Sequence, residues 1–386
     1  MKVFIIAGEA SGDKLGAAMM MGIQNLTSKN TDFTGVGGPL MEGMGLKSLF
    51  PMDEISLMGI SEILAQYRQL KKRIRQTAEA ILDAKPDVLI TIDLPEFSFR
   101  VAKLVKQASD IPTVHYVAPT VWAWRPGRAQ KIAKYIDHIL ALFPFEPPLM
   151  HEAGMSCDFV GHPVVEDPIA TQKEVQEFKS FFGLNSAPIL LCLPGSRRSE
   201  IKRLSPIFDK ALRKVLSRHP KMNIVLPAAT PVADQVKNAL QDWGHKPVVL
   251  DPRDYTPQQA ARYKRAAFKA ADLALAASGT VSLELAANQT PMVIAYDMNW
   301  LSRQIIGRML RVESVNLVNL VSESRAVPEY IGQACQPDSI AFSLLEVLED
   351  PDAQNFAMQQ TMQRLRASGA EPENYAAQSV LNFLSR

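Results

Sequence analysis

Short apolar runs alternate with longer helical patterns along the chain, and this alternation restarts halfway. VFIIA opens the first series, and PILLCLPGSRRSEI opens the second with a strand, a glycine-containing loop and the start of a helix. Several runs are apolar on both faces, which is typical of parallel strands covered by helices. We expect strands within 3–7, 32–38, 87–93, 112–119, 138–145 and 157–163, and then within 188–201, 223–230, 247–251, 273–280 and 291–297.

Two successive βα series predict an α/β fold with two Rossmann-like, doubly wound domains that face each other across a cleft. The 386 residues are ample for two separate cores. We expect the first domain over 1–165 and the second over 166–351, with the crossing in the charged segment 164–181. The tail 352–386 is helical with no following strand, and we expect it to pack back on the first domain.

The composition excludes several classes of protein. Lys and Arg number 42 against 40 Asp and Glu, so no global field favours a nucleic-acid partner. The cysteines Cys157, Cys192 and Cys335 are sparse and form no CxxC pair, which suits a reducing compartment and argues against structural zinc. The apolar run at the amino terminus is too short for a signal peptide and has the wrong flanking residues. No apolar stretch reaches membrane-spanning length. We expect a cytoplasmic protein.

One candidate phosphate site lies in the second half, although the chain has neither GxGxxG nor a Walker A sequence. The stretch ASGTVSLELA puts Ser278, Gly279 and Thr280 between a strand and a helix. Hydroxyls and bare amides at the amino terminus of a helix favour a phosphate group. Glu284, one turn along that helix, could accept hydrogen bonds from a ribose diol.

A second loop in the same half, LPGSRRSE, offers Arg197 just past a strand. A guanidinium there can bridge a diphosphate and stabilise it as a leaving group. Either loop alone could equally be an ordinary capped turn. Two of them in one half favour a nucleotide diphosphate.

The corresponding loop of the first half, AGEASGD, is acidic. Carboxylates bind sugar hydroxyls rather than phosphates, so this half is expected to face the other substrate. We expect Glu9 to contact that substrate and Asp13 to cap its own helix.

Asp93 ends the expected strand in TIDLPEFSFR, at the carboxyl edge where α/β sheets place their active sites. A carboxylate there can act as general base on a sugar hydroxyl. From its position alone, Asp93 could equally be a residue that only forms the turn before Leu94 and Pro95.

Other polar residues are interpreted as structural. His115 and His162 read as strand-end histidines, and Cys192 as a core residue. The DxD of 350–352, a metal signature in some sugar transferases, reads here as a helix cap, and we expect neither a metal nor a cofactor.

An apolar stripe beside a basic cluster occurs in SLMGISEILAQYRQLKKRIRQ (56–76), and WLSRQIIGRMLR (300–311) repeats the mixture. This is the pattern of a helix on an anionic membrane surface, although the pattern alone slightly favours burial in the core. The candidate membrane contacts are Leu57, Met58, Ile60, Arg68, Lys71, Lys72 and Arg73.

The motifs AGEASGD, IDxPEF, TVWAWRPGR, LFPFE, VGHP, LPGSRRSE and ASGTVSLE occur in the order and approximate spacing of the lipid-A-disaccharide synthase family. The chain resembles that family from near residue 1 to beyond Asn319. The resemblance implies a metal-independent, inverting glycosyltransferase of the GT-B type. It implies that UDP-2,3-diacylglucosamine and 2,3-diacylglucosamine 1-phosphate are joined into the β-1,6-linked lipid A disaccharide 1-phosphate, with release of UDP.

The resemblance also implies roles for individual residues. Asp93 matches the family's essential aspartate, proposed as the base, while Arg197 matches a functional arginine and Asn319 a functional asparagine near the carbohydrate. Glu96 and Ser98 depart from the family's usual IDxPDFN, and Val318 stands where proline usually precedes the asparagine. These departures leave the role of the PEFS turn open.

Acylated substrates make the membrane interpretation of 56–76 the better one, so we expect peripheral association with the cytoplasmic face of the inner membrane. Two alternatives share the architecture: another UDP-sugar enzyme, such as a nucleotide-sugar epimerase, and a non-catalytic sensor that closes on a nucleotide sugar. A sensor needs no base, so Asp93 counts against it, and an epimerase has no use for a membrane-adhesive surface.

Overall fold

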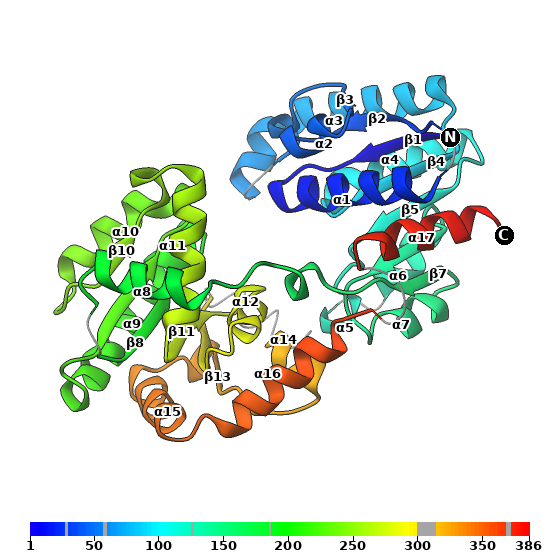
Figure 1. The fold of residues 1–386 in the computed structure, drawn as a ribbon. Helices are drawn as coiled ribbons and strands as arrows, with labels where there is room; N and C mark the ends of the chain where they lie inside the picture. The colour runs from blue at the N-terminus through cyan, green and yellow to red at the C-terminus, as the bar shows by residue number, and fades with distance from the viewer. Residues whose placement is uncertain (28–29, 57–59, 125–126, 185–186, 299–313, 368–371) are drawn as a thin grey trace. The chain divides into compact units, whose positions relative to one another are not determined.

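The computed structural model of the chain describes residues 1–386 except 28–29, 57–59, 125–126, 185–186, 299–313 and 368–371 (Figure 1). The side chains of 60–67, 123–124 and 372–373 are also outside the described part. The chain forms two compact units. The first unit is Met1–Pro163 with Leu365–Arg386, and the second unit is Val164–Arg364.

The first unit is built on a parallel sheet of seven strands in the order β3-β2-β1-β4-β5-β6-β7. The strands are β1 (Lys2–Ile6), β2 (Asp32–Val36), β3 (Lys47–Ser48), β4 (Val88–Ile92), β5 (Thr113–Tyr116), β6 (His138–Ala141) and β7 (Ser156–Phe159). Its helices are α1 (Ala10–Leu26), α2 (Pro39–Gly43), α3 (Ile60–Ala84), α4 (Pro95–Ala108), α5 (Val121–Trp124), α6 (Gly127–Ile132), α7 (Pro147–Glu152) and α17 (Pro372–Leu384).

The second unit repeats this plan with six parallel strands in the order β10-β9-β8-β11-β12-β13. The strands are β8 (Ile189–Leu193), β9 (Asn223–Pro227), β10 (Val248–Leu250), β11 (Leu273–Ala277), β12 (Met292–Tyr296) and β13 (Glu329–Ile331). Its helices are α8 (Gln172–Phe181), α9 (Arg198–Arg218), α10 (Ala233–Ala239), α11 (Pro257–Ala270), α12 (Val281–Ala287), α14 (Leu317–Ser322), α15 (Pro337–Glu349) and α16 (Asp352–Arg364).

Every expected strand is present, and only β1 and β7 begin one residue before the expected range. All five residues of β4, β8 and β11 are buried, as expected for central parallel strands. The sequence analysis missed β3 and β13. These are short edge strands, Lys-Ser and Glu-Tyr-Ile, without a fully apolar run.

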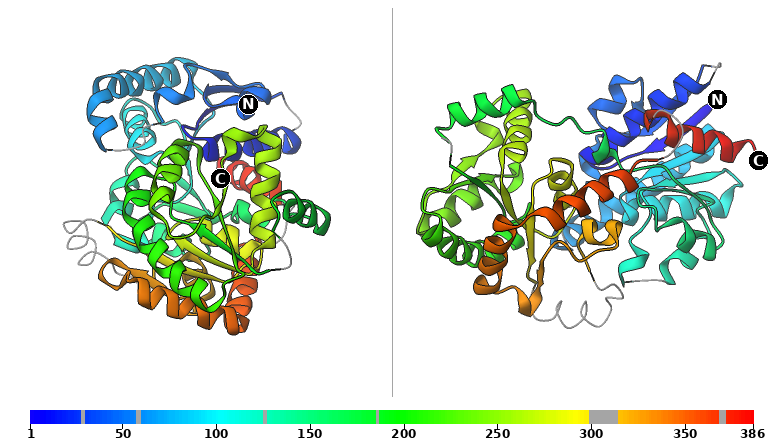
Figure 2. Two further views of the ribbon diagram at one scale, coloured as in Figure 1. Left: turned by 90° about the vertical axis from the view of Figure 1, so that its left-hand side faces the viewer. Right: turned by 60° about the horizontal axis from the view of Figure 1, so that its bottom comes forward.

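The helical tail divides between the two units, which corrects the expectation for 352–386. Helix α16 packs on α14 and α12 of the second unit (Figure 2), and only the chain from Leu365 onward belongs to the first unit. The boundary between the units falls after Pro163 rather than after residue 165. In the first unit α17 lies against α1 (Figure 1).

Buried polar groups fix α17 to the sheet of the first unit. The Ser379 hydroxyl lies 2.8 Å from His138 Nε2 and donates to Asp158 Oδ2 at 2.6 Å. The Phe383 ring stacks on the imidazole of His138, with ring centroids 4.9 Å apart. The resemblance of this trio to a catalytic triad is superficial, because the serine lies between the histidine and the aspartate instead of beside the histidine alone.

Asp13 caps α2 rather than its own helix, which corrects the sequence-based expectation. Its buried carboxylate accepts the backbone N–H groups of Gly38, Leu40 and Met41 at 2.9 to 3.0 Å. The first turn of α2 needs such acceptors, because no earlier helical residue can supply them. The carboxylate therefore ties α1 to α2.

Glu146, in the LFPFE motif, is a buried carboxyl group at the carboxyl end of β6. It accepts hydrogen bonds from Phe143 N at 3.0 Å, Leu142 N at 3.2 Å and Trp122 Nε1 at 3.3 Å. Burial raises the pKa of Glu146 from 4.5 to about 8, and these hydrogen bonds only partly oppose the rise. The group joins the turn after β6 to α5.

Replacing Glu146 with Gln should flatten the dependence of stability on pH. Between pH 4.5 and about 8 the folded state keeps the proton that the unfolded state has released. The free energy of unfolding of the parent should therefore fall as pH rises, by up to about 1.4 kcal/mol per pH unit from this group. Urea unfolding of the parent and E146Q across this range measures the difference in slope.

The same exchange at Glu152, an exposed residue of α7, is the matched control and should keep the parent's slope. Equal slopes for the parent and E146Q would show that Glu146 is ionised in the folded protein.

Candidate functional site

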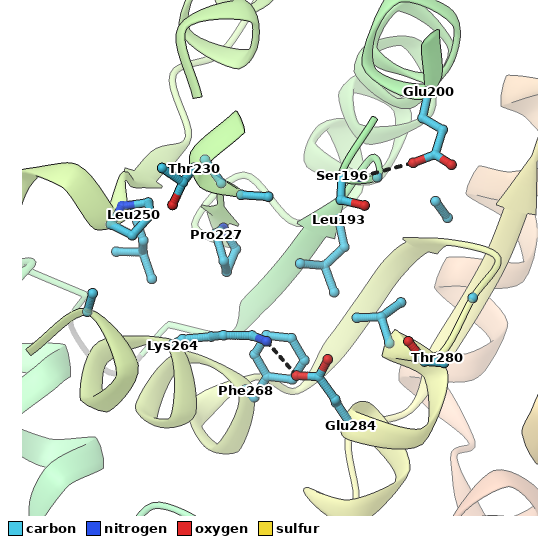
Figure 3. A pocket seen from close by; sticks show the side chains of 18 of the residues that line it. Leu193, Ser196, Glu200, Pro227, Thr230, Leu250, Lys264, Phe268, Thr280 and Glu284 are labelled. Atoms are coloured by element: carbon cyan, nitrogen blue, oxygen red, sulfur yellow. Dashed lines mark hydrogen bonds and ion pairs between the residues drawn. The ribbon is translucent and has the colours of Figure 1, made fainter. Parts of the chain in front are cut away.

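A cavity of about 670 Å³ opens at the carboxyl edge of the second unit's sheet (Figure 3). It lies where β8 and β11 are neighbours and the connections run in opposite directions along the sheet. Doubly wound sheets bind their ligands at this point. The cavity brings together the residues that we expected to contact the nucleotide, namely Arg197, Ser278, Gly279, Thr280 and Glu284.

The loop after β8 presents a guanidinium, while its backbone amides are already occupied. Glu200 Oε2 accepts the N–H groups of Ser196 at 3.0 Å and Arg197 at 3.2 Å. Gly195 has a φ of +114° and passes so close to Glu200 that a β-carbon would clash with this carboxylate. The Arg197 side chain is 77% exposed and lies 3.5 Å from Glu200 Oε1. The loop therefore offers Arg197 itself to an anion.

The loop after β11 has a different character. No side-chain hydrogen bond caps α12 at Thr280, and the Ser282 hydroxyl donates backwards to the carbonyl of Gly279 at 2.9 Å. Ser278, Gly279 and Thr280 all line the cavity. Among the described residues, Glu200 thus accepts the amides of the Arg197 loop, whereas the Thr280 side chain makes no such bond at its own turn.

Glu284 and Lys264 form an ion pair in the wall of the cavity. Lys264 Nζ donates to Glu284 Oε2 at 2.6 Å and lies 5.3 Å from the centre of the Phe268 ring (Figure 3). The sequence analysis singled out Glu284 but missed Lys264 and Phe268. Residues 260, 264 and 268 are spaced for one helix face, but the sequence does not show which face of α11 meets the cavity.

The turn after β4 holds Asp93 in an uncommon conformation. Asp93 and Leu94 have φ of 48° and 49°, two successive left-handed residues without a glycine. Asp93 N donates to Tyr116 O at 2.9 Å, and the Ser98 hydroxyl donates to Asp93 O at 2.8 Å. Such backbone strain persists only where the surroundings enforce it, and it is concentrated at functional sites.

The environment of the Asp93 carboxyl group favours proton uptake. Burial raises its pKa above the ordinary value, and the backbone N–H of Leu94 partly opposes this. Ser98, where the family usually has Asn, supports the backbone of this turn, while Glu96 is exposed and pairs with Arg100 at 3.1 Å. The departures in PEFS therefore leave the carboxyl group of Asp93 in place.

Glu9 follows β1, the strand next to β4, at the corresponding point of the first unit's sheet. It is the residue before α1, with extended backbone at φ −141°. A β-carbon at Gly8 would clash with the side chain of Leu94, so the Glu9 loop and the Asp93 turn are in contact. Glu9 and Asp93 thus follow neighbouring strands at the same sheet edge.

Asn319 is buried in α14 and does not line the cavity after β8 and β11. Its amide donates to Val327 O and Glu329 Oε1, both at 2.8 Å, and accepts from Val327 N at 3.0 Å. The neighbouring Val318 N donates to Asn316 Oδ1 at 2.7 Å, a bond that the family's usual proline cannot make. Asn319 therefore fixes α14 to the chain before β13.

The basic part of α3 is partly free and partly engaged. Arg68, Lys71 and Lys72 are exposed, but Arg73 donates to both carboxylate oxygens of Glu54 at 2.7 and 2.8 Å. The guanidinium of Arg73 also lies 4.4 Å from the centre of the Phe50 ring. Arg73, a predicted membrane contact, is therefore already paired with a carboxylate of its own unit.

The apolar half of the predicted membrane surface is not described. Leu57 and Met58 lie outside the described residues, as does the side chain of Ile60, and the second stretch 300–311 lies outside them entirely. Further along α3, Leu70 and Ile74 are buried in the core of the first unit. The apolar stripe of the helix therefore enters the core from residue 70 onward.

The residues interpreted as structural occupy structural positions. His115 is buried in β5 with Nδ1 2.7 Å from the Thr91 hydroxyl, and burial lowers its pKa to about 3. Cys192 is buried in β8, and Asp350 Oδ1 accepts the N–H of Asp352 at 3.2 Å at the start of α16. His162 lies after β7, where its ring approaches that of Phe143.

Among the described residues, no group of three or more His, Cys, Asp or Glu side chains is arranged to hold a metal ion. None of the helices in the described ranges has the length and apolar character needed to cross a membrane.

The chain shares its fold with several solved structures. A Staphylococcus aureus MnaA–UDP structure superposes with a TM-score of 0.63 at 14% identity, covering 100% of this chain and 96% of that one. UDP-GlcNAc 2-epimerase from Neisseria meningitidis, bound to UDP-GlcNAc, superposes with a TM-score of 0.63 at 13% identity, covering 100% of both chains. Acinetobacter baumannii MurG superposes with a TM-score of 0.54 at 14% identity, covering 100% of this chain and 99% of that one. At these identities the likeness shows the fold alone.

Sequence comparison identifies the family. A profile of the lipid-A-disaccharide synthetase family matches residues 3–383. The lipid-A-disaccharide synthase of Ruegeria pomeroyi is 59% identical over 384 residues, covering 100% of this chain and 96% of the relative. The lipid-A-disaccharide synthase of Rhodospirillum centenum is 42% identical over 389 residues, covering 100% of this chain and 95% of the relative. The chain therefore belongs to the lipid-A-disaccharide synthase family and is a glycosyltransferase of lipid A biosynthesis.

Proposed function

We propose that this chain transfers 2,3-diacylglucosamine from its UDP derivative to 2,3-diacylglucosamine 1-phosphate. The observation that carries the proposal is the cavity of about 670 Å³, in which Arg197, Thr280 and Glu284 meet at the switch point of the second sheet. Its size lies in the range of cavities that hold nucleotide-sized ligands. Here the second unit is the UDP-donor domain, and the first unit is the acceptor and membrane-facing domain.

The donor lies with its diphosphate between Arg197 and the turn of Ser278, Gly279 and Thr280, and with its ribose at Glu284. Arg197 is well suited to the leaving group, because its guanidinium is exposed and carries two parallel pairs of donors. As the bond from the anomeric carbon to the diphosphate breaks, negative charge grows on UDP and the guanidinium stabilises it.

Asp93 takes the proton from the 6-hydroxyl of the acceptor while that oxygen attacks the anomeric carbon. The attack comes from the face opposite UDP, so a single displacement inverts the anomeric centre and gives the β-1,6 bond. The raised pKa of Asp93 supports this role, since a stronger base removes the proton more readily. Glu9 binds hydroxyls of the acceptor sugar, and Asn319 acts through the chain segments that it holds together.

The reaction itself is the first test of this proposal. Supplying both diacyl substrates to the purified protein should give the disaccharide 1-phosphate and one UDP for each disaccharide. UDP release without the disaccharide would point to hydrolysis of the donor instead.

Asp93→Asn should lower turnover by roughly 10²- to 10⁴-fold, the usual weight of general acid–base catalysis. The amide keeps the shape of the carboxyl group but does not accept the proton. UDP affinity should barely change, because the second unit's cavity is intact. Rate measurements at saturating substrates, with UDP calorimetry alongside, give both values.

Glu96→Gln is the matched control, because Glu96 is exposed on the same turn and pairs with Arg100. It should retain near-parental turnover. A folded Asp93→Asn enzyme with near-normal turnover would remove Asp93 from the mechanism.

Arg197→Ala should weaken UDP binding by about 1.5–3 kcal/mol, the scale of a hydrogen bond to a charged group. Arg198→Ala removes an equal charge from the adjacent exposed residue, which does not line the cavity, and should change UDP affinity little. Calorimetric titration with UDP compares them. Unchanged affinity in Arg197→Ala would move the diphosphate elsewhere.

Peripheral binding to the cytoplasmic face of the inner membrane follows from the acylated substrates and the exposed cations of α3. Replacing Arg68, Lys71 and Lys72 with Gln should lower binding to anionic vesicles roughly a hundredfold, at about 1 kcal/mol per cation. Added salt should weaken the parent's binding in the same way, because it screens the charges. Vesicle sedimentation measures both effects.

Replacing three exposed cations of the second unit, Lys210, Arg218 and Lys221, with Gln controls for net charge. Equal vesicle binding by the two triple variants would show that α3 is not the membrane surface. Serine at Leu57, Met58 and Ile60 should reduce vesicle binding and leave UDP affinity intact, if these side chains reach the bilayer as the sequence predicts.

A further inference from the structure

The ion pair between Lys264 and Glu284 stands in the wall of the nucleotide cavity, where stability alone gives little reason for it. Lys264 is 51% exposed and Glu284 37%, and exposed ion pairs contribute little to folding stability. The pair nevertheless has a short N–O distance of 2.6 Å. The Lys264 side chain passes over the ring of Phe268 to reach the carboxylate (Figure 3).

A second, smaller cavity of about 240 Å³ lies on the other side of this pair, beneath the chain segment 164–169. Lys264, Phe268 and Glu284 line both cavities. The pair and the ring together form the partition between the two spaces.

The pair leaves hydrogen-bonding capacity of both kinds. The ammonium group has three donors and the carboxylate has two oxygens, and their mutual bond uses one donor and Oε2. Glu284 Oε1 can still accept, and Lys264 Nζ can still donate. A carboxylate alone can only accept from a ribose diol, whereas this pair can accept from one hydroxyl and donate to its neighbour.

We propose that Lys264 is a second diol-recognising residue: Glu284 accepts from one ribose hydroxyl while Lys264 donates to the other. The pair would then distinguish a ribonucleotide from a deoxyribonucleotide at both hydroxyl positions. This inference rests on the nucleotide site proposed above and adds a residue and a specificity to it.

The test compares UDP with its 2′-deoxy and 3′-deoxy forms by calorimetry. The parent should bind both deoxy forms more weakly than UDP, each by roughly tenfold or more for a lost hydrogen bond to a charged group. Lys264→Met should bind UDP more weakly and lose the discrimination at one of the two hydroxyls only. Lys264→Arg keeps donors at this position and should restore most of that discrimination.

Lys269→Met is the matched control, because Lys269 is exposed on the same helix and lies outside the nucleotide cavity. It should keep both discriminations. Melting temperatures of all variants establish that each is folded before its affinities are compared.

One result would overturn the inference: Lys264→Met keeps the parent's discrimination at both hydroxyls. If its affinity for UDP were also unchanged, Lys264 would not contact the nucleotide. If its affinities for UDP and both deoxy forms fell by one common factor, Lys264 would act on the diphosphate instead. A parent protein that bound no UDP would instead overturn the nucleotide site itself.

Discussion

In each unit all strands run parallel, so their carboxyl ends meet at one edge of the sheet. The order β3-β2-β1-β4 in the first unit and β10-β9-β8-β11 in the second makes the connections diverge on either side of one strand pair. The loops that follow this pair separate and leave room for a ligand. Asp93 and Glu9 follow one such pair, and Arg197 and Thr280 follow the other. The two candidate sites are therefore consequences of strand order.

The chain fills some of its helix amino termini with its own carboxylates, and this decides which ones can serve a ligand. Asp13 takes three amides at α2, and Glu200 takes two at α9. At α12 the side chain of the N-cap residue Thr280 makes no capping hydrogen bond. The acidic loop of the first unit is thus partly structural, because Asp13 serves the fold while Glu9 stands beside the Asp93 turn.

The two Rossmann-like sheets, their strands except β3 and β13, and five residues of the cavity after β8 and β11 could be predicted, because apolar runs and βα loops are local signals. Asn319 shows the limit of that reasoning: its motif matched a functional residue, but the two residues that its side chain contacts lie 8 and 10 positions further along. Lys264 was missed because nothing in an isolated helix indicates which face meets a cavity. The placement of α16 in the second unit and the engagement of Arg73 by Glu54 depend on contacts distant in sequence, which no local pattern contains.

The first unit is made from two separated stretches of chain, and this affects its synthesis. His138 and Ser379, which meet in that unit, stand 241 positions apart. At ordinary rates of translation, a ribosome needs roughly 12 to 48 s to cover that distance. During this interval the nascent first unit leaves the surfaces of α1 and β6 that α17 later covers open to other partners, while the second unit is still emerging. A chaperone that shields this seam would protect the unit until its last helix arrives.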